Sequence, residues 1–252
     1  HRLGAVADLI AVGRSAAGSL AHLVFGIAAS GVSPDAVDGQ AIYRVRVRLV
    51  ALDQRDRALT GLDTTLVIRH TRPLKAGQFL VGRAEVTLPP GDWFYRASLQ
   101  QGDSVGVVLP RQSVLVAAAA GSPLALSDIA LGSRGRAVAW VTDAADTVLL
   151  APSALFRKGS DVELYYETGG ATPGLQYRHE ISVLRAERPG AKRRRPLVAL
   201  SFEEAAPDSI IRSQRVLRLE RLKEGSYVVE VKITAPDGAS QTRQRSLRVI
   251  PR

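Results

Sequence analysis

The chain has 252 residues and a mass of 27.0 kDa; 46% of the residues are apolar and 23% are charged. It is therefore long enough for two ordinary domains and apolar enough to bury a core, which excludes a disordered or collagen-like chain. Cysteine is absent, which excludes disulfides, a thiolate nucleophile and Cys-ligated metals. The formal net charge of +10 favours acidic partners without choosing among nucleic acid, anionic lipid and acidic protein.

Residues 1–19 have no counterpart later in the chain and are predicted to be a short N-terminal arm. The arm is either a helix-like or extended segment that lies on another surface, or a frayed terminus. Its apolar residues are candidates for contact with a partner: Leu3, Val6, Leu9 and Ile10. Methionine is absent even at position 1, so we expect that a leader such as a secretory signal was removed upstream.

The longest apolar stretch, Leu20 to Ala29, follows the arm and contains His22. It is too short for a membrane span, which needs roughly 20 apolar residues. Beyond it, apolar residues alternate with polar ones from Tyr43 to Leu49, where the polar positions are all arginine. The same period of two recurs from Trp93 to Leu99 and from Tyr227 to Ile233. This period is typical of half-buried strands with one face in a core.

The chain resembles itself at an offset of 134 residues. Tyr43 falls on Tyr177, and a unit of Leu, two variable residues, Gly and an aromatic-led strand occurs both at Leu88 and at Leu222. Any two β-rich segments align somewhere, but the offset is nearly constant over about fifty residues, which indicates a repeat. We predict an all-β fold of two tandem Ig/fibronectin-III-like β-sandwiches, over residues 20–121 and 122–252, after the arm of residues 1–19.

Motifs that carry catalysis are missing from the sequence. There is no Gly-x-Ser-x-Gly elbow, no phosphate-binding glycine loop and no dinucleotide fingerprint, and none of the four histidines forms a spaced pair for zinc. Two pairs of carboxylates are available for general acid–base catalysis or for Ca²⁺ binding: Glu203 with Glu204, and Asp143 with Asp146. We expect them instead to cap turns and to keep loops solvated. We therefore predict no enzyme, with no catalytic residue, no cofactor and no metal site.

The densest charge run is Lys192, Arg193, Arg194 and Arg195, which follows Pro189-Gly190 in a predicted loop. The run is interpreted as a solvated loop or as a contact for acidic protein or anionic lipid headgroups. Nucleic acid is disfavoured, because aromatic residues are only 5% of the chain and lie mainly on core faces. Phe94, which the alternation directs away from the core, is a further candidate contact residue.

Three segments carry a resemblance to a known family: Leu88 to Trp93, Leu126 to Leu131 and Val162 to Glu167. Their turn-and-strand patterns resemble the C-terminal sandwich region of bacterial GWxTD-domain proteins, over most of residues 20–252. The segment Ala139 to Asp143 comes near the naming motif, but it lies in an expected strand, so we treat that match as a coincidence. The resemblance implies an exported protein of unknown biochemical activity and transfers no catalytic residue.

These observations predict a non-enzymatic, extracytoplasmic (periplasmic) structural or interaction protein. We expect a membrane-extrinsic accessory subunit that clamps or stabilises a larger membrane complex, of a respiratory, transport or photosynthetic kind. The expected partners are protein subunits of that complex and anionic lipid headgroups, with no nucleic acid and no small-molecule substrate. The alternatives are a carbohydrate- or polymer-binding module of a secreted enzyme, which would need exposed coplanar aromatics, and an enzyme that uses strand-borne carboxylates.

Overall fold

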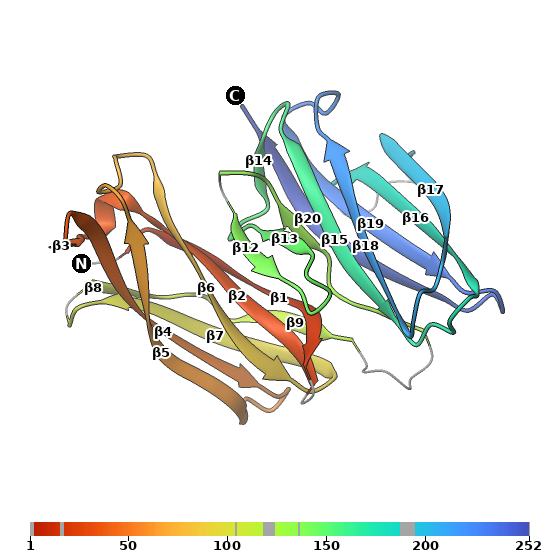
Figure 1. The fold of residues 1–252 in the computed structure, drawn as a ribbon, viewed down its shortest axis with the longest axis horizontal. Helices are drawn as coiled ribbons and strands as arrows, with labels where there is room; N and C mark the ends of the chain where they lie inside the picture. Colours follow the sequence, from red (N-terminus) through yellow and green to blue (C-terminus); the bar gives the residue numbers. More distant parts are fainter. Residues whose placement is uncertain are drawn as a thin grey trace.

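The computed structural model describes residues 3–15, 18–103, 105–117, 124–135, 137–186 and 195–251 (Figure 1). Regular structure in these ranges is β-strand apart from one short 3₁₀ turn, η1 (Ala29–Gly31), so the all-β prediction is confirmed. Figure 1 shows the strands in two groups side by side, one coloured from red to yellow and the other from green to blue.

The first group contains two sheets. The smaller sheet has the order β1-β2-β6 and the larger has β4 at its centre, between β5 and β7, with β3, β8 and β9 at its margins. All of these pairings are antiparallel. Their bounds are β1 (Ala5–Ser15), β2 (Gly18–Ala28), β3 (Asp35–Val37), β4 (Gln40–Leu52), β5 (Ala58–His70), β6 (Phe79–Leu88), β7 (Gly91–Gln101), β8 (Val105–Val108) and β9 (Gln112–Val116).

The second group also contains a smaller and a larger sheet, together with a separate β12-β13 hairpin. The smaller sheet has β15 between β18 and the short strands β10 and β11, and the larger has the order β14-β20-β19-β16-β17. The bounds are β10 (Ala125–Leu126), β11 (Ala130–Gly132), β12 (Val138–Val141), β13 (Thr147–Leu150), β14 (Leu155–Arg157), β15 (Asp161–Gly169), β16 (Gln176–Arg185), β17 (Val198–Ala205), β18 (Ile210–Arg218), β19 (Gly225–Thr234) and β20 (Ser240–Ile250).

Each group buries its own apolar core between its two sheets. In the first group the core joins residues of β1, β2 and β6, such as Phe25, to residues of β4, β7 and β9, such as Tyr43 and Tyr95. In the second group it joins β15 to β16, β19 and β20 in the same way, with Tyr166 and Tyr227 among its fully buried side chains. In the first group, the alternation along β4 explains how this strand contributes to the core: its apolar side chains point into the core and its arginines point to solvent.

The two turns that the repeat predicts to correspond have the same local structure. Gly91 and Gly225 begin β7 and β19 with φ of 140° and 144°, a conformation that favours glycine. Two residues later, Trp93 Nε1 donates to the Pro89 carbonyl at 2.8 Å, and the Tyr227 hydroxyl donates to the Lys223 carbonyl at 2.6 Å. In both turns an aromatic side chain therefore ties the start of the strand to the carbonyl four residues before it.

The prediction of an N-terminal arm is wrong. Residues 5–15 form β1, which pairs along its length with β2, from Ala5 opposite Ile27 to Ser15 opposite Gly18. The first sandwich therefore begins within residues 1–19 and not at residue 20. The arm was predicted because residues 1–19 have no counterpart in the second repeat. These residues also lack the strict polar–apolar alternation of β4.

Candidate functional site

The most extensive site in the described residues is the seam where the two groups of sheets meet. Its centre is an apolar cluster that takes members from both groups: Ile10, Val12 and Val24 of β1 and β2, and Ala130, Trp140, Val148, Leu150 and Tyr165 from the second group. All of these side chains are at most 5% exposed. The seam is thus a third core of the molecule.

Strands β1 and β2 are buried on both faces. On β1, Leu9 and Ala11 point into the core of the first sandwich, whereas Ile10 and Val12 point into the seam. On β2, Leu23 and Phe25 join the first core, whereas His22 and Val24 lie against the second sandwich. A strand that is buried on both faces has an almost continuous apolar sequence, which explains why these residues show no alternation.

His22 is the polar residue at the centre of the seam and is fully buried. The guanidinium Nη1 of Arg83 lies 2.7 Å from its Nδ1, and its Nε2 lies 3.0 Å from the Val12 carbonyl. Because arginine only donates, Nδ1 is the acceptor and Nε2 carries the hydrogen that Val12 accepts. Burial, together with the positive charge of Arg83, lowers the pKa of His22 to about 3, so the ring is neutral near pH 7.

Trp140 of β12 is the second sandwich's main contribution to the seam. Its ring lies 4.5 Å from the His22 ring and meets the Tyr165 ring edge-on at 6.0 Å. Gly13 of β1 has φ of 87°, and a Cβ atom there would lie 2.5 Å from the Trp140 ring. Glycine is therefore required at this position both by its backbone conformation and by the close approach of the second sandwich.

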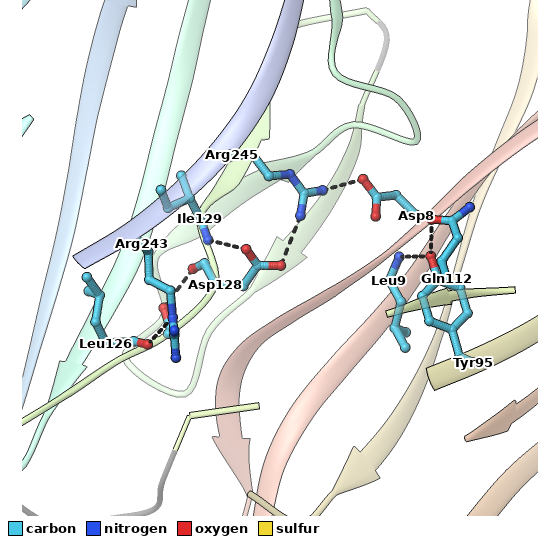
Figure 2. A network of polar contacts seen from close by, with 10 residues as sticks. Asp8, Leu9, Tyr95, Gln112, Leu126, Asp128, Ile129, Arg243 and Arg245 are labelled. Carbon is cyan, nitrogen blue, oxygen red and sulfur yellow. Dashed lines mark hydrogen bonds and ion pairs between the residues drawn. The ribbon is translucent and has the colours of Figure 1, made fainter. Parts of the chain in front are cut away.

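A charged bridge closes one end of the seam (Figure 2). Arg245 of β20 lies between two carboxylates, donating to Asp8 of β1 and, at 2.9 Å, to Asp128 of the second sandwich. The Arg245 side chain is only 15% exposed. Burial alone would lower the pKa of Arg245, but the carboxylates of Asp128 and Asp8 outweigh it and raise that pKa. Burial also raises the pKa of Asp8, against the opposing effect of Arg245.

Backbone and neighbouring polar groups fix this bridge to both sandwiches. The Asp128 amide donates to the Ala11 carbonyl of β1 at 3.0 Å, and the Tyr95 hydroxyl accepts from the Leu9 amide at 3.2 Å. Arg243 Nε donates to the Leu126 carbonyl at 3.0 Å. A polar cleft of about 520 Å³ opens beside the bridge, lined on one side by residues of β1 and β9 and on the other by residues of β20.

The other end of the seam is also charged. Glu167 of β15 is buried and accepts from the Tyr165 hydroxyl at 2.8 Å, and its burial raises its pKa. Arg14 of β1 reaches this end and packs on Gly169, where a Cβ atom would lie 1.8 Å from Arg14 Nη2. The seam therefore has an apolar centre and polar ends, and β1 contributes to all three parts.

A second candidate site is the outer face of the larger sheet of the first sandwich, which we call the arginine face. It is formed by the outward residues of β4, β5 and β7 with the neighbouring β3, and it carries five arginines, Arg44, Arg46, Arg48, Arg69 and Arg96, against three carboxylates, Asp35, Asp63 and Asp92. The side chains of Arg44, Arg46 and Arg48 are 46–52% exposed.

Asp63 neutralises part of this face. Arg46 donates to both of its carboxylate oxygens at 2.8 Å, and Arg48 donates at 3.0 Å. These hydrogen bonds, chiefly those from Arg46, lower the pKa of Asp63. Arg69 and Arg96 are exposed and have no ion pair within the part of the chain that the structure describes. The arginine face thus keeps a net positive charge and free guanidinium donors.

Three of the predicted contact residues are buried inside the molecule. Leu3 and Leu9 belong to the first core and Ile10 to the seam, each at most 2% exposed, so their prediction as contacts for an outside partner is wrong. Val6 is 39% exposed. The physical reason is that β1 binds another part of the same chain.

The remaining predicted contacts lie elsewhere. Phe94 is on the outward side of β7, half-buried under the guanidinium of Arg111, which lies 3.6 Å from the ring centroid. Trp93 points to the opposite face and packs against the first core. Phe94 and Trp93 therefore do not form the exposed coplanar pair that a carbohydrate-binding module would need. Lys192, Arg193 and Arg194 lie outside the described residues, and Arg195 is exposed.

Sequence reasoning missed the residues that build the seam. Arg245 and Asp8 are 237 positions apart, and no local pattern connects them. The apolar stretch from Leu20 was a usable signal, because a strand in a two-sheet sandwich needs only one apolar face. Within the described ranges no cluster of three or more His, Asp or Glu residues is arranged to hold a metal ion, and no helix is long and apolar enough to cross a membrane.

Comparisons with known proteins add little to this description. No family model and no curated protein matches the sequence. Among solved structures the chain is similar to red sea bream transglutaminase, with 10% identity and a TM-score of 0.29, over 98% of this chain and 31% of that chain. The chain thus spans about a third of the length of that structure. At this TM-score the similarity supports no argument about function.

Proposed function

We propose that this protein is a non-enzymatic structural and interaction protein. In this proposal the seam holds the two sandwiches as one rigid body, and the arginine face binds an acidic partner. The observation that carries the proposal is the arginine face, where five arginines meet three carboxylates on an open sheet.

The seam supports the rigid part of the proposal. Interfaces between domains of one chain are usually polar and mobile. Here the side chains at the centre of the seam are as buried as those of a domain core. Arg245 links carboxylates of both sandwiches with little exposure to solvent. Rotation of one sandwich against the other would expose Trp140 and would separate Arg245 from Asp8, so one orientation is favoured.

The chemistry of the arginine face supports an acidic protein as the partner. A guanidinium presents a planar fork of donors that matches a carboxylate, as the bidentate Arg46–Asp63 pair on this face already shows. Arg69 and Arg96 offer the same fork to carboxylates of another protein. We propose that this partner is an acidic subunit of an extracytoplasmic membrane complex, to which the chain binds as an accessory subunit. The resemblance to exported GWxTD-domain proteins supports that compartment.

The test compares two triple variants with the same change in charge. R44Q/R69Q/R96Q neutralises the arginine face, and R157Q/R218Q/R248Q removes three exposed arginines of the second sandwich. Co-sedimentation is measured with membranes of the producing cells, with the same membranes after protease treatment, and with vesicles of their extracted lipids. We expect the face variant to bind native membranes about tenfold more weakly than the control variant, with binding lost after protease treatment.

Two results would overturn the proposal. Equal binding by both variants would remove the arginine face from the interaction. Undiminished binding to protein-free vesicles would show that the lipid headgroups, and not an acidic protein, are recognised.

A further inference from the structure

We propose that β5 is a dimerisation strand, which pairs antiparallel with β5 of a second copy of this chain about a two-fold axis at Leu66. This goes beyond the proposed function, because it assigns a partner to the sheet edge and not to the arginine face.

The first observation is that β5 is a long, free edge. It has 13 residues and pairs with β4 on one side, and no other strand of the described ranges pairs with it. From Thr60 to His70 its pairing with β4 has no bulge, and the sequence there contains no proline and no lysine. Bulges, prolines and lysines are features by which sheet proteins usually block their edges. Because this edge lacks all three between Thr60 and His70, it is competent to accept another strand.

The second observation is an incompletely covered apolar row beside that edge. Leu62, Leu66 and Ile68 point to the inner side of β5 and pack against the first core, but each stays partly exposed. On the outer side Val67 is 45% exposed. The inner row of a second copy would cover these side chains and extend the core across the two sheets.

The third observation is charge complementarity, and it selects the register. Asp63 and Arg69 are the charged outward residues in the paired part of the strand, placed three residues on either side of Leu66. An antiparallel two-fold pairing centred on Leu66 therefore sets Asp63 of each copy opposite Arg69 of the other. Arg69 has no ion pair in the described part of one chain, and this arrangement supplies one.

The edge strand β17 of the second group does not offer the same complementarity. Strand β17 also pairs on one side only, but it has 8 residues, and its charged residues are Glu203 and Glu204, both acidic. Two copies of β17 would bring like charges together, which disfavours pairing. A two-fold β5 contact is also closed, so it yields a dimer and not a filament.

The dimer has a consequence for the arginine face. Residues directly opposite in paired strands point to the same side of the sheet, so the β4 arginines of both copies would lie on one continuous surface. Two such faces joined rigidly would bind a repeated or extended acidic surface with an effective concentration that a single copy lacks.

The test is a charge exchange measured by sedimentation velocity over a range of protein concentration. D63R places arginine opposite arginine, and R69D places aspartate opposite aspartate, in the proposed register. We expect the unmodified chain to dimerise and each variant to dimerise at least about tenfold more weakly. An equimolar mixture of D63R and R69D restores both opposite-charge pairs, so we expect it to form a heterodimer.

R96D is the matched control for R69D, because it makes the same charge change on the same face, but on β7, away from the β5 edge. D63R also removes the ion pairs of Asp63 with Arg46 and Arg48 of its own chain, so its control is the rescue expected in the mixture with R69D. Circular dichroism and a thermal melt of each variant establish that it folds. The proposal is overturned if the unmodified chain is monomeric at every concentration, if R96D weakens dimerisation as much as R69D, if the mixed variants stay monomeric, or if open-ended oligomers form. No acidic ligand is present in this experiment, so its outcome is independent of the membrane-binding test.

Discussion

The two outer faces of the first sandwich show how one fold makes a permanent contact and an open one. The face of β1, β2 and β6 presents Ile10, Val12 and Val24 and is covered by the second sandwich. The face of β4, β5 and β7 presents arginines and stays in solvent. The difference lies in the alternate residues of each strand, since the inward residues of both sheets serve the same core. A covered face needs apolar side chains, whereas an open face needs charge.

Trp140→Ala breaks the covered face at its centre and has the largest expected effect. The change removes a side chain that is 5% exposed and leaves a cavity between His22 and Tyr165. We expect a loss of about 3–5 kcal/mol in the free energy of unfolding, measured by chemical denaturation. Phe94→Ala, on the open face, is the control and should cost much less. Equal losses would contradict the distinction between the two faces.

The pH dependence of stability tests the polar residue of the seam. The folded-state pKa of His22 is about 3, below its ordinary 6.5. Between these two pH values the ring is protonated in the unfolded chain and neutral in the folded chain. The contribution of His22 is therefore present above pH 6.5 and is lost as pH falls toward 3. Between pH 6.5 and 4.5 this amounts to about 2–3 kcal/mol.

His22→Gln is expected to flatten this dependence, as measured by denaturation at a series of pH values. The raised pKa of Asp8 and of Glu167 acts in the opposite direction at lower pH, and it is common to both proteins, so the difference between them isolates His22. His70→Gln, on β5, serves as the control. An unchanged slope in the His22 variant would mean that the ring is accessible to protons in the folded chain.

Arg245→Met tests the charged end of the seam. The variant leaves Asp8 and Asp128 facing each other without their shared cation, at side-chain exposures of 28% and 18%. We expect a loss of about 2 kcal/mol in the free energy of unfolding, discounted from the value for fully buried pairs because these groups are partly hydrated. The triple variant D8N/R245M/D128N should recover part of the loss. If the single variant is neutral, the bridge does not stabilise the seam.

The open face was readable from the sequence, and the covered face was not. The arginines at positions 44, 46 and 48 alternate with core residues, and the pattern predicted both the strand and its exposed side. The turns at Gly91 and Gly225 were predicted from their shared motif, and both have the expected strand after them. These features depend on neighbours within a few residues.

The seam depends instead on residues that are distant in the sequence. Ile10 and Leu9 are equally apolar, and only the position of the second sandwich decides that one faces the seam and the other the core. The bridge from Asp8 to Arg245 spans most of the chain. The arm was therefore predicted to bind an outside partner, although the surface that it binds belongs to the same molecule.

The most direct test of the account is the distance distribution between the two sandwiches in solution. Because the chain has no cysteine, R96C and E203C provide two unique exposed sites for spin labels on β7 and β17. Double electron–electron resonance is recorded on labelled chain diluted in unlabelled chain, so that only distances within one molecule contribute. We predict one narrow distribution that broadens when Trp140→Ala is added. A broad distribution without that substitution would contradict a seam that fixes the two sandwiches.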